Sequence, residues 1–238
     1  LSASPKNLFW LNTNEIVFDH DHRGSARVMR LNLLNKKLYE VIPSFKDQFY
    51  LSSTYQDSLY GVYINSNRPG EVGMISNSKL ETLTQHNELI LSQYELGVTN
   101  EINYKSPDKM DIQGWYITPP NFDKSKKYPL ILVIHGGPHA MYRPAFNYSW
   151  HQFASDGYVV LYTNPRGSTG YGSEFANIID NDYPGAGDLS DLLAGVDHLT
   201  EKGFIDESKM YVQGCSGGGV LTAWVVGHDD RFAAAASL

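Results

Sequence analysis

The chain has 238 residues, of which 42% are hydrophobic and 19% charged, a composition typical of one or two folded domains and not of a disordered chain. The formal charge of −7, without any cluster of basic residues among aromatics, argues against binding to nucleic acid or to an anionic membrane. No apolar run approaches the roughly 20 residues that a membrane-spanning helix needs, so we expect a soluble protein. A single cysteine, Cys215, cannot form an internal disulfide, which favours a reducing compartment such as the cytoplasm.

The first 100 residues follow the pattern of antiparallel β structure. Turn-forming residues separate short segments in which apolar and polar residues alternate, so each predicted strand has one face for a core and one for water. The predicted strands are Glu15–His20, Ala26–Leu33, Leu38–Ile42, Ser58–Asn65, Glu71–Ile75 and Lys79–Leu83, and one of the predicted turns is Asn67–Gly70.

The strand pattern of this half recurs after roughly 45 residues, which is within the range for the blades of a β-propeller. Two repeats cannot close a ring, so residues 1–100 are predicted to be part of a larger propeller. A small independent β-sandwich is the alternative. The chain also begins with Leu1, without an initiator Met or a signal-peptide pattern, and we therefore expect it to be cut from a longer protein.

From residue 101 onward, predicted strands alternate with predicted helices. Such alternation indicates an α/β domain with a mostly parallel sheet, in which ligands bind at the carboxyl ends of the strands. The predicted strands are Asp111–Thr118, Tyr128–Ile134, Tyr158–Tyr162, Met210–Gln213 and Phe232–Ser237. The predicted helices are Asn147–Asp156, Leu189–Lys202 and Gly218–His228.

The segment Gly214-Cys-Ser-Gly-Gly218 lies where a predicted strand meets a predicted helix. This is the setting of a G-x-S-x-G nucleophile elbow, in which small neighbours let the strand and helix approach and leave the Ser216 hydroxyl clear of the backbone. The N-terminus of the helix also directs free N–H groups toward any negative charge that forms there. The alternative is a glycine-rich turn with an incidental serine. Cys215 is expected to be a small filler of the turn.

Two further loops follow predicted strands. His135-Gly-Gly-Pro-His139 leaves backbone N–H groups uncovered by side chains, which suits an oxyanion hole; otherwise, its glycines serve only to reverse the chain. In the loop after the next strand, Arg166 is expected to brace the loop by pairing with Asp188 or Asp191, with contact to a substrate carboxylate as the alternative.

Together these residues resemble the prolyl oligopeptidase family of serine peptidases, and in particular its acylaminoacyl-peptidase-like branch. The segments that carry the resemblance cover most of residues 101–238 in the expected order. They are His135-Gly-Gly-Pro-His139, Tyr162-Thr-Asn-Pro-Arg-Gly-Ser-Thr-Gly-Tyr-Gly172, Ala194-Gly-Val-Asp197, Gly214-Cys-Ser-Gly-Gly-Gly219 and Trp224-Val-Val-Gly-His-Asp-Asp-Arg-Phe232.

The resemblance implies propeller blades in residues 1–100 and, in residues 101–238, an α/β-hydrolase fold that is incomplete at its C-terminus. It implies that Ser216 is the acylated nucleophile, that Gly217 and Gly137 supply the oxyanion N–H groups, and that the substrates are short peptides. It implies neither a cofactor nor a metal. The chain departs from the family's usual pattern at Gly217, where a bulky residue is common.

The histidine that would deprotonate Ser216 is not evident in the chain. In α/β-hydrolases the acid and then the base follow the nucleophile, so His135, His139, His151 and His198 precede it and do not fit. His228 follows it, but twelve residues of helix separate the two by roughly 18 Å. In the resembled family both partners come from later loops. The triad Asp and His are therefore expected beyond residue 238.

This interpretation has two consequences and leaves two alternative functions. The chain alone is expected to be inactive, and residues 232–237 would form an apolar sheet edge through which two copies can pair. An esterase or other acyl hydrolase is an alternative function, because the same elbow serves ester substrates. A non-catalytic binding module based on the propeller is the other alternative.

Overall fold

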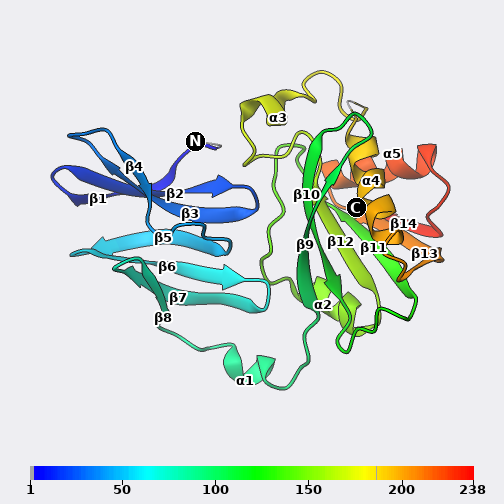
Figure 1. Ribbon diagram of the computed structural model, residues 1–238, viewed down its shortest axis with the longest axis horizontal. Coiled ribbons are helices and arrows are strands. Elements are labelled where there is room, and N and C mark those ends of the chain that lie inside the picture. Colours follow the sequence, from blue (N-terminus) through cyan, green and yellow to red (C-terminus); the bar gives the residue numbers. More distant parts are fainter. Residues whose placement is uncertain (1–2, 186) are drawn as a thin grey trace. The chain divides into compact units, whose positions relative to one another are not determined.

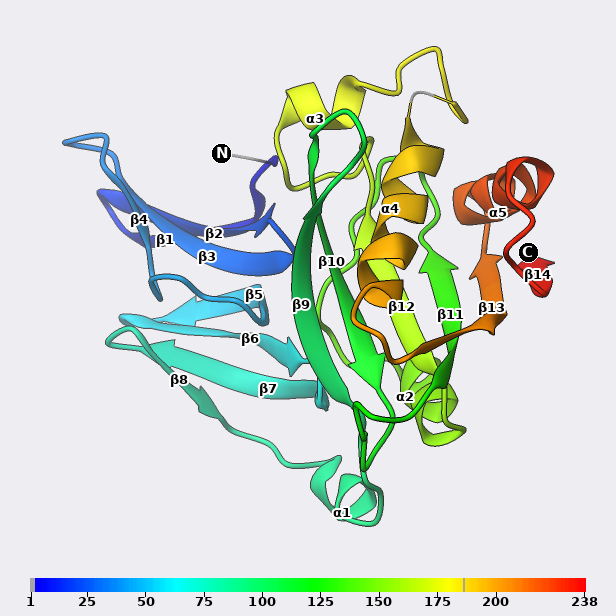
Figure 2. The ribbon, with the colours of Figure 1, turned by 45° about the vertical axis from the view of Figure 1, so that its right-hand side comes forward.

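The computed structural model describes residues 3–185 and 187–238 and divides into two compact units (Figures 1 and 2). The first unit comprises the residues up to Tyr94 together with residues 143–147, and the second comprises residues 95–142 and 148–238. The division falls a few residues before residue 101, because the first strand of the second unit begins at Val98 and pairs along its whole length with the next strand.

The first unit is an eight-stranded sheet built from two antiparallel meanders of four strands each. One parallel pairing, between Ala26 and Gln48, joins the two meanders. The buried side chains Val17, Val28, Phe49, Leu51, Leu59 and Ile75 form its core. The strands are β1 Lys6–Asn12, β2 Glu15–His22, β3 Ser25–Asn32, β4 Leu38–Glu40, β5 Gln48–Tyr55, β6 Ser58–Asn65, β7 Arg68–Ser76 and β8 Lys79–Thr82, and a short helix, α1 Glu88–Leu91, follows.

Strands β1 and β5 were not among the predicted ones. In β1 a run of four apolar residues hides any alternation, and Leu8 and Trp10 within it are exposed. In β5 the apolar start gives way to Ser-Ser-Thr, which resembles a turn. The turn expected at Asn67–Gly70 is also shorter than predicted, because β7 already begins at Arg68. Its proline lies next to the first residue of the strand, near the strand start where the ladder best tolerates a missing N–H.

The second unit contains a six-stranded mixed sheet in the order β14-β13-β11-β12-β10-β9. The neighbours β12, β11, β13 and β14 run parallel, whereas β10 pairs antiparallel with both β12 and β9. Four neighbouring strands of six are thus parallel, which agrees with the predicted mostly parallel sheet, and the two antiparallel strands lie at one edge. The bounds are β9 Val98–Lys105, β10 Asp111–Thr118, β11 Tyr128–Ile134, β12 Val159–Asn164, β13 Ile205–Gly214 and β14 Ala234–Ser237.

Helices cover both faces of this sheet, as the side chains of the central strand β11 show. Leu130, Leu132 and Ile134 join a core cluster that includes residues of α4 and α5, whereas Ile131 and Val133 join a second cluster that includes residues of α2. This explains why β11 is apolar throughout, as strands buried on both faces are. The helices are α2 Tyr148–Ser155, α3 Ser173–Asn177, α4 Asp188–Thr200 and α5 Gly217–His228.

A buried ion pair ties the loop after β12 to helix α4. Arg166 donates from Nε to Asp191 Oδ2 at 2.8 Å and from Nη2 to Asp191 Oδ1 at 2.7 Å, and its Nη1 donates to Asp108 Oδ2 at 2.8 Å. The side chain of Asp191 is fully buried and that of Arg166 is 7% exposed. Of the two carboxylates expected to brace Arg166, Asp191 does so, whereas Asp188 accepts from the backbone N–H of Leu189 at the start of α4.

We expect Arg166→Met to lower the free energy of unfolding by about 3–5 kcal/mol, because it leaves the buried Asp191 carboxylate without its cation. The control is Lys105→Met, which removes a cation paired with the exposed Asp111 at 2.6 Å and should cost about 0–1 kcal/mol. Urea unfolding of both variants measures the difference. Equal losses would contradict the bracing role of Arg166.

Candidate active site

Ser216 lies on a tight turn between β13 and α5. Its backbone has φ 57° and ψ −122°, a conformation that residues other than glycine rarely adopt. Its side chain does not cap the helix that begins at the next residue, and the residue is exposed. The Ser216 hydroxyl is therefore not taken up by a capping hydrogen bond to the helix.

The glycines around Ser216 are required by close backbone contacts. A Cβ atom at Gly214 would lie 2.3 Å from the carbonyl oxygen of Gly218, and a Cβ atom at Gly218 would lie 2.3 Å from that of Ile134. Both distances are far below any real contact of such atoms. The strand, the helix and the end of β11 can meet here only because these positions lack side chains, as expected from the sequence.

The segment His135–His139 lies directly against this turn. A Cβ atom at Gly136 would be 3.0 Å from the carbonyl oxygen of Cys215, and one at Gly217 would be 2.6 Å from that of Gly137. Gly137 itself has φ +126°, which reverses the chain toward His139. The two residues predicted to supply oxyanion donors are thus neighbours in space, and Gly217 adjoins Ser216 in the chain.

Hydrogen bonds to the loop after β12 hold this segment from its other side. His135 Nε2 lies 2.9 Å from Ser168 Oγ, and His139 Nδ1 lies 3.1 Å from the carbonyl oxygen of Gly167. The N–H of Thr169 donates to the carbonyl of Ala140 at 2.8 Å. Burial lowers the pKa of His135, so its ring is neutral near pH 7. The ring therefore acts as a link between two loops.

Three further histidines of the second unit lie on helices α2, α4 and α5. His228 ends α5, where its Nδ1 lies 2.8 Å from the carbonyl oxygen of Trp224. His198 stacks on Tyr104 with 5.9 Å between ring centroids, and His151 is buried in α2. The contacts of His228 and His198 are therefore to Trp224 and Tyr104 and not to the nucleophile.

The described residues hold no group of three or more His, Cys, Asp or Glu side chains that could bind a metal ion. Nor does any helix in the described ranges have the length and apolar character needed to cross a membrane.

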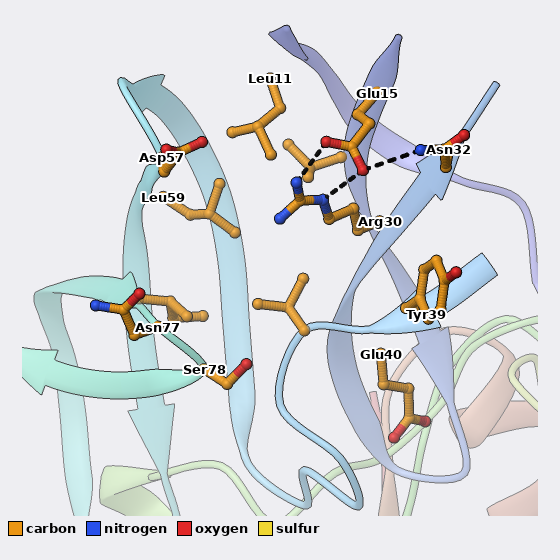
Figure 3. Close-up of a pocket in the computed structure, with 13 residues that line it drawn as sticks. Leu11, Glu15, Arg30, Asn32, Tyr39, Glu40, Asp57, Leu59, Asn77 and Ser78 are labelled. Atoms are coloured by element: carbon orange, nitrogen blue, oxygen red, sulfur yellow. Dashed lines mark hydrogen bonds and ion pairs between the residues drawn. The ribbon is translucent and has the colours of Figure 1, made fainter. Parts of the chain in front are cut away.

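The first unit has a cavity of its own, of about 580 Å³, whose lining is drawn in Figure 3. In this lining the carboxylate of Glu15 accepts from Arg30 Nε at 3.0 Å and from Asn32 Nδ2 at 3.4 Å (Figure 3). It also accepts from Asn12 Nδ2 at 2.8 Å. The bond to Arg30 is the main reason that the pKa of Glu15 falls to about 2. Because its principal charges pair with each other, this cavity gives no sign of a particular ligand.

Comparison with known proteins identifies the family of the second unit. Residues 144–238 match the model of the prolyl oligopeptidase family. They belong to that family. The prolyl oligopeptidase family had been inferred from the motifs of this same region, so the resemblance seen in the sequence is confirmed.

Curated relatives extend the match over most of the chain. An uncharacterized peptidase of Bacillus subtilis, YuxL, is 37% identical over 191 residues, which are 79% of this chain and 29% of that protein. A probable dipeptidyl-peptidase 5 of Emericella nidulans is 30% identical over 246 residues, covering 95% of this chain and 33% of the relative. The chain thus spans about a third of the length of these relatives.

The structure is also similar to a solved peptidase structure. The uncomplexed acylaminoacyl peptidase of Pyrococcus horikoshii superposes with a TM-score of 0.87 at 27% sequence identity. The match covers all of this chain and 37% of the archaeal enzyme. Both units of the chain therefore have counterparts in one peptidase.

The structure also reveals a contact that the sequence did not indicate. The hydroxyl of Tyr183 donates to the carbonyl oxygen of Gly217 at 2.5 Å. Tyr183 lies between α3 and α4, 34 residues before its partner, in a stretch without a recognisable motif. Only the fold brings the two residues together.

We expect Gly217→Ala to destabilise the protein by about 1–3 kcal/mol, because the new methyl group would overlap the backbone of Gly137. Gly227→Ala is the matched control in the same helix, since a Cβ atom there meets nothing within 4 Å. That variant should be neutral or more stable by about 0.5–1 kcal/mol. Thermal and urea unfolding compare the two, and a Gly217→Ala protein as stable as the control would contradict the described packing.

Proposed function

We propose that this chain supplies the nucleophile of a serine peptidase that hydrolyses short peptides, of the acylaminoacyl-, dipeptidyl- or oligopeptidase type. In this proposal Ser216 forms the acyl-enzyme, and the N–H groups of Gly217 and Gly137 form the oxyanion hole. Residues 101–238 are assigned to an α/β-hydrolase domain and residues 1–100 to blades of a β-propeller, which admits only small substrates.

The observation that carries the proposal is the conformation of Ser216 at the start of α5. A strained serine between a parallel strand and a helix, with small residues on both sides, is the arrangement of a nucleophile elbow. Strain at a residue other than glycine persists only where the surrounding structure enforces it, and such strain concentrates at functional sites. The peptidase names of the relatives point to the same chemistry.

The proposed reaction has two acyl-transfer steps. A general base takes the proton of the Ser216 hydroxyl while its oxygen attacks the carbonyl carbon of the substrate, and the carbonyl oxygen becomes an oxyanion. Collapse of this intermediate breaks the C–N bond, and the amine leaves with the proton from the base. Water then attacks the carbonyl carbon of the acyl-enzyme while the same base takes its proton. Collapse of this second intermediate breaks the bond between the carbonyl carbon and the Ser216 oxygen, which regains the proton from the base, and the acid is released.

Within this scheme the chain's own residues stabilise the oxyanion. The N–H groups of the first turn of α5 carry the positive end of the helix dipole, and Gly137 approaches Gly217 from the neighbouring loop. Removal of one such donor typically costs about 2.7–4 kcal/mol of transition-state stabilisation. The base and the acid that orients it are proposed to come from residues beyond Leu238, because in α/β-hydrolases both follow the nucleophile in the chain, and His228 ends the helix that begins at the elbow, with its Nδ1 at the carbonyl oxygen of Trp224.

A fluorophosphonate probe tests the nucleophile directly in the full-length protein. We expect one adduct, on Ser216, which is absent from Ser216→Ala and retained by Cys215→Ala, the control for the neighbouring thiol. The same proteins are then assayed on acyl-amino-acid amides, dipeptidyl amides and p-nitrophenyl esters. An adduct elsewhere on an active enzyme would refute the role of Ser216, and turnover of esters alone would favour an acyl hydrolase over a peptidase.

Residues 1–238 expressed alone should hydrolyse peptide amides far more slowly than the full-length protein. Without a base, only the roughly 10³–10⁴-fold acceleration over water that donors and binding provide should remain. The exposed strand β14 ends the sheet, so light scattering should show dimers or larger species. A monomer with full activity would show that the chain contains its own base.

A further inference from the structure

Glycine at residue 217 does little to restrict the backbone conformation there. It is the first of three consecutive glycines that open α5, and glycine has the widest conformational freedom of any residue. All three are nevertheless buried. A hydrogen-bond donor stabilises an oxyanion only if it is held in place before the charge forms. Other parts of the protein must therefore hold Gly217.

Two groups contact Gly217 from outside its helix. On one side lies the backbone of Gly137, which occupies the space that a side chain at residue 217 would take. The second group is the Tyr183 hydroxyl, which donates to the carbonyl oxygen of Gly217 at 2.5 Å. The first contact excludes movement in one direction, whereas the hydrogen bond orients the peptide between Gly217 and Gly218.

Contacts of Tyr183 and of the residue before it restrain the position of its side chain. Its ring packs against the core cluster that contains Leu192 and Leu221 of helices α4 and α5. The preceding residue, Asp182, donates its N–H to the carbonyl of Ile179 at 3.1 Å. Burial raises the pKa of Tyr183 to about 12, so the hydroxyl keeps its proton near pH 7 and can donate it.

We propose that Tyr183 is a positioning residue for the oxyanion hole. Its hydroxyl holds the carbonyl of Gly217, and this restrains the Cα of Gly217, to which the nitrogen of the donating N–H group is directly bonded. The inference rests on the proposed function, in which that N–H stabilises the oxyanion. Tyr183 contacts neither the substrate nor the nucleophile in this role. Its loss should therefore weaken the stabilisation of the transition state and leave the binding of the substrate unchanged.

The test compares Tyr183→Phe with Tyr63→Phe in the full-length protein. Tyr63 is a matched control, because it is also partly buried and its hydroxyl hydrogen-bonds Asp47 Oδ2 at 2.8 Å, within the first unit. For Tyr183→Phe we expect kcat on a peptide amide to fall roughly 3- to 10-fold, the effect of one lost hydrogen bond, with KM within about twofold. Tyr63→Phe should leave both constants within about twofold.

A peptidyl trifluoromethyl ketone, which forms an oxyanion on the nucleophile, isolates the proposed effect. Its inhibition constant should rise in Tyr183→Phe by the same factor as kcat falls, whereas the affinity for a product peptide should not change. Unchanged kcat and unchanged inhibition would overturn the proposal. So would an equal loss of product affinity, because that indicates general damage to the site. Thermal unfolding verifies that each variant is folded.

Failure of the proposed function gives a different result. If the wild-type protein hydrolyses no amide or ester, or if Ser216→Ala keeps its activity, the catalytic assignment is wrong whatever Tyr183 does. Hydrogen exchange at the amides of residues 217–219 then tests the contact itself. Faster exchange in Tyr183→Phe than in Tyr63→Phe supports the hold on Gly217, and equal exchange in both variants refutes it.

Discussion

The close crossing of backbones at Gly214 and Gly218 is the constraint on which the candidate site depends. The end of β13, the first turn of α5 and the end of β11 meet where no side chain fits between them. This crossing forces the intervening Ser216 into its strained conformation, and its side chain makes no capping hydrogen bond to the helix. The same crossing brings the loop after β11 against the residue that follows the serine.

Around this crossing, backbone groups pack directly against one another in places where side chains usually fill the space. Gly217 has no side chain to pack, and the backbone of Gly137 fills the space beside it. The loop that contains Gly137 is supported by His135 and His139 through Ser168 and Gly167, and the ion pair of Arg166 with Asp191 supports that second loop in turn. The position of the proposed donors therefore depends on two loops and a helix at once.

Much of the α/β unit could be predicted from the sequence, because its signals are local. The apolar run of β11 indicated a strand buried on both faces, and glycines on both sides of Ser216 indicated a sharp strand-to-helix turn. Strands β1, β5 and β9 escaped prediction, since β1 lacks alternation and the others mix polar residues with apolar ones. The antiparallel pairing of β9 with β10 was not predicted, because β9 itself was not recognised and pairing direction has no local signal.

Residue types at short, fixed spacings were enough to indicate the family, the class of the second unit and the sharp turn around Ser216. Only the tertiary structure showed that Arg166 pairs with Asp191 and not with Asp188, and that Tyr183 reaches Gly217. Both contacts join residues 25 or more positions apart. Partners so distant meet only when the sheet and its helices have packed, because the chain pattern around each residue is compatible with many partners.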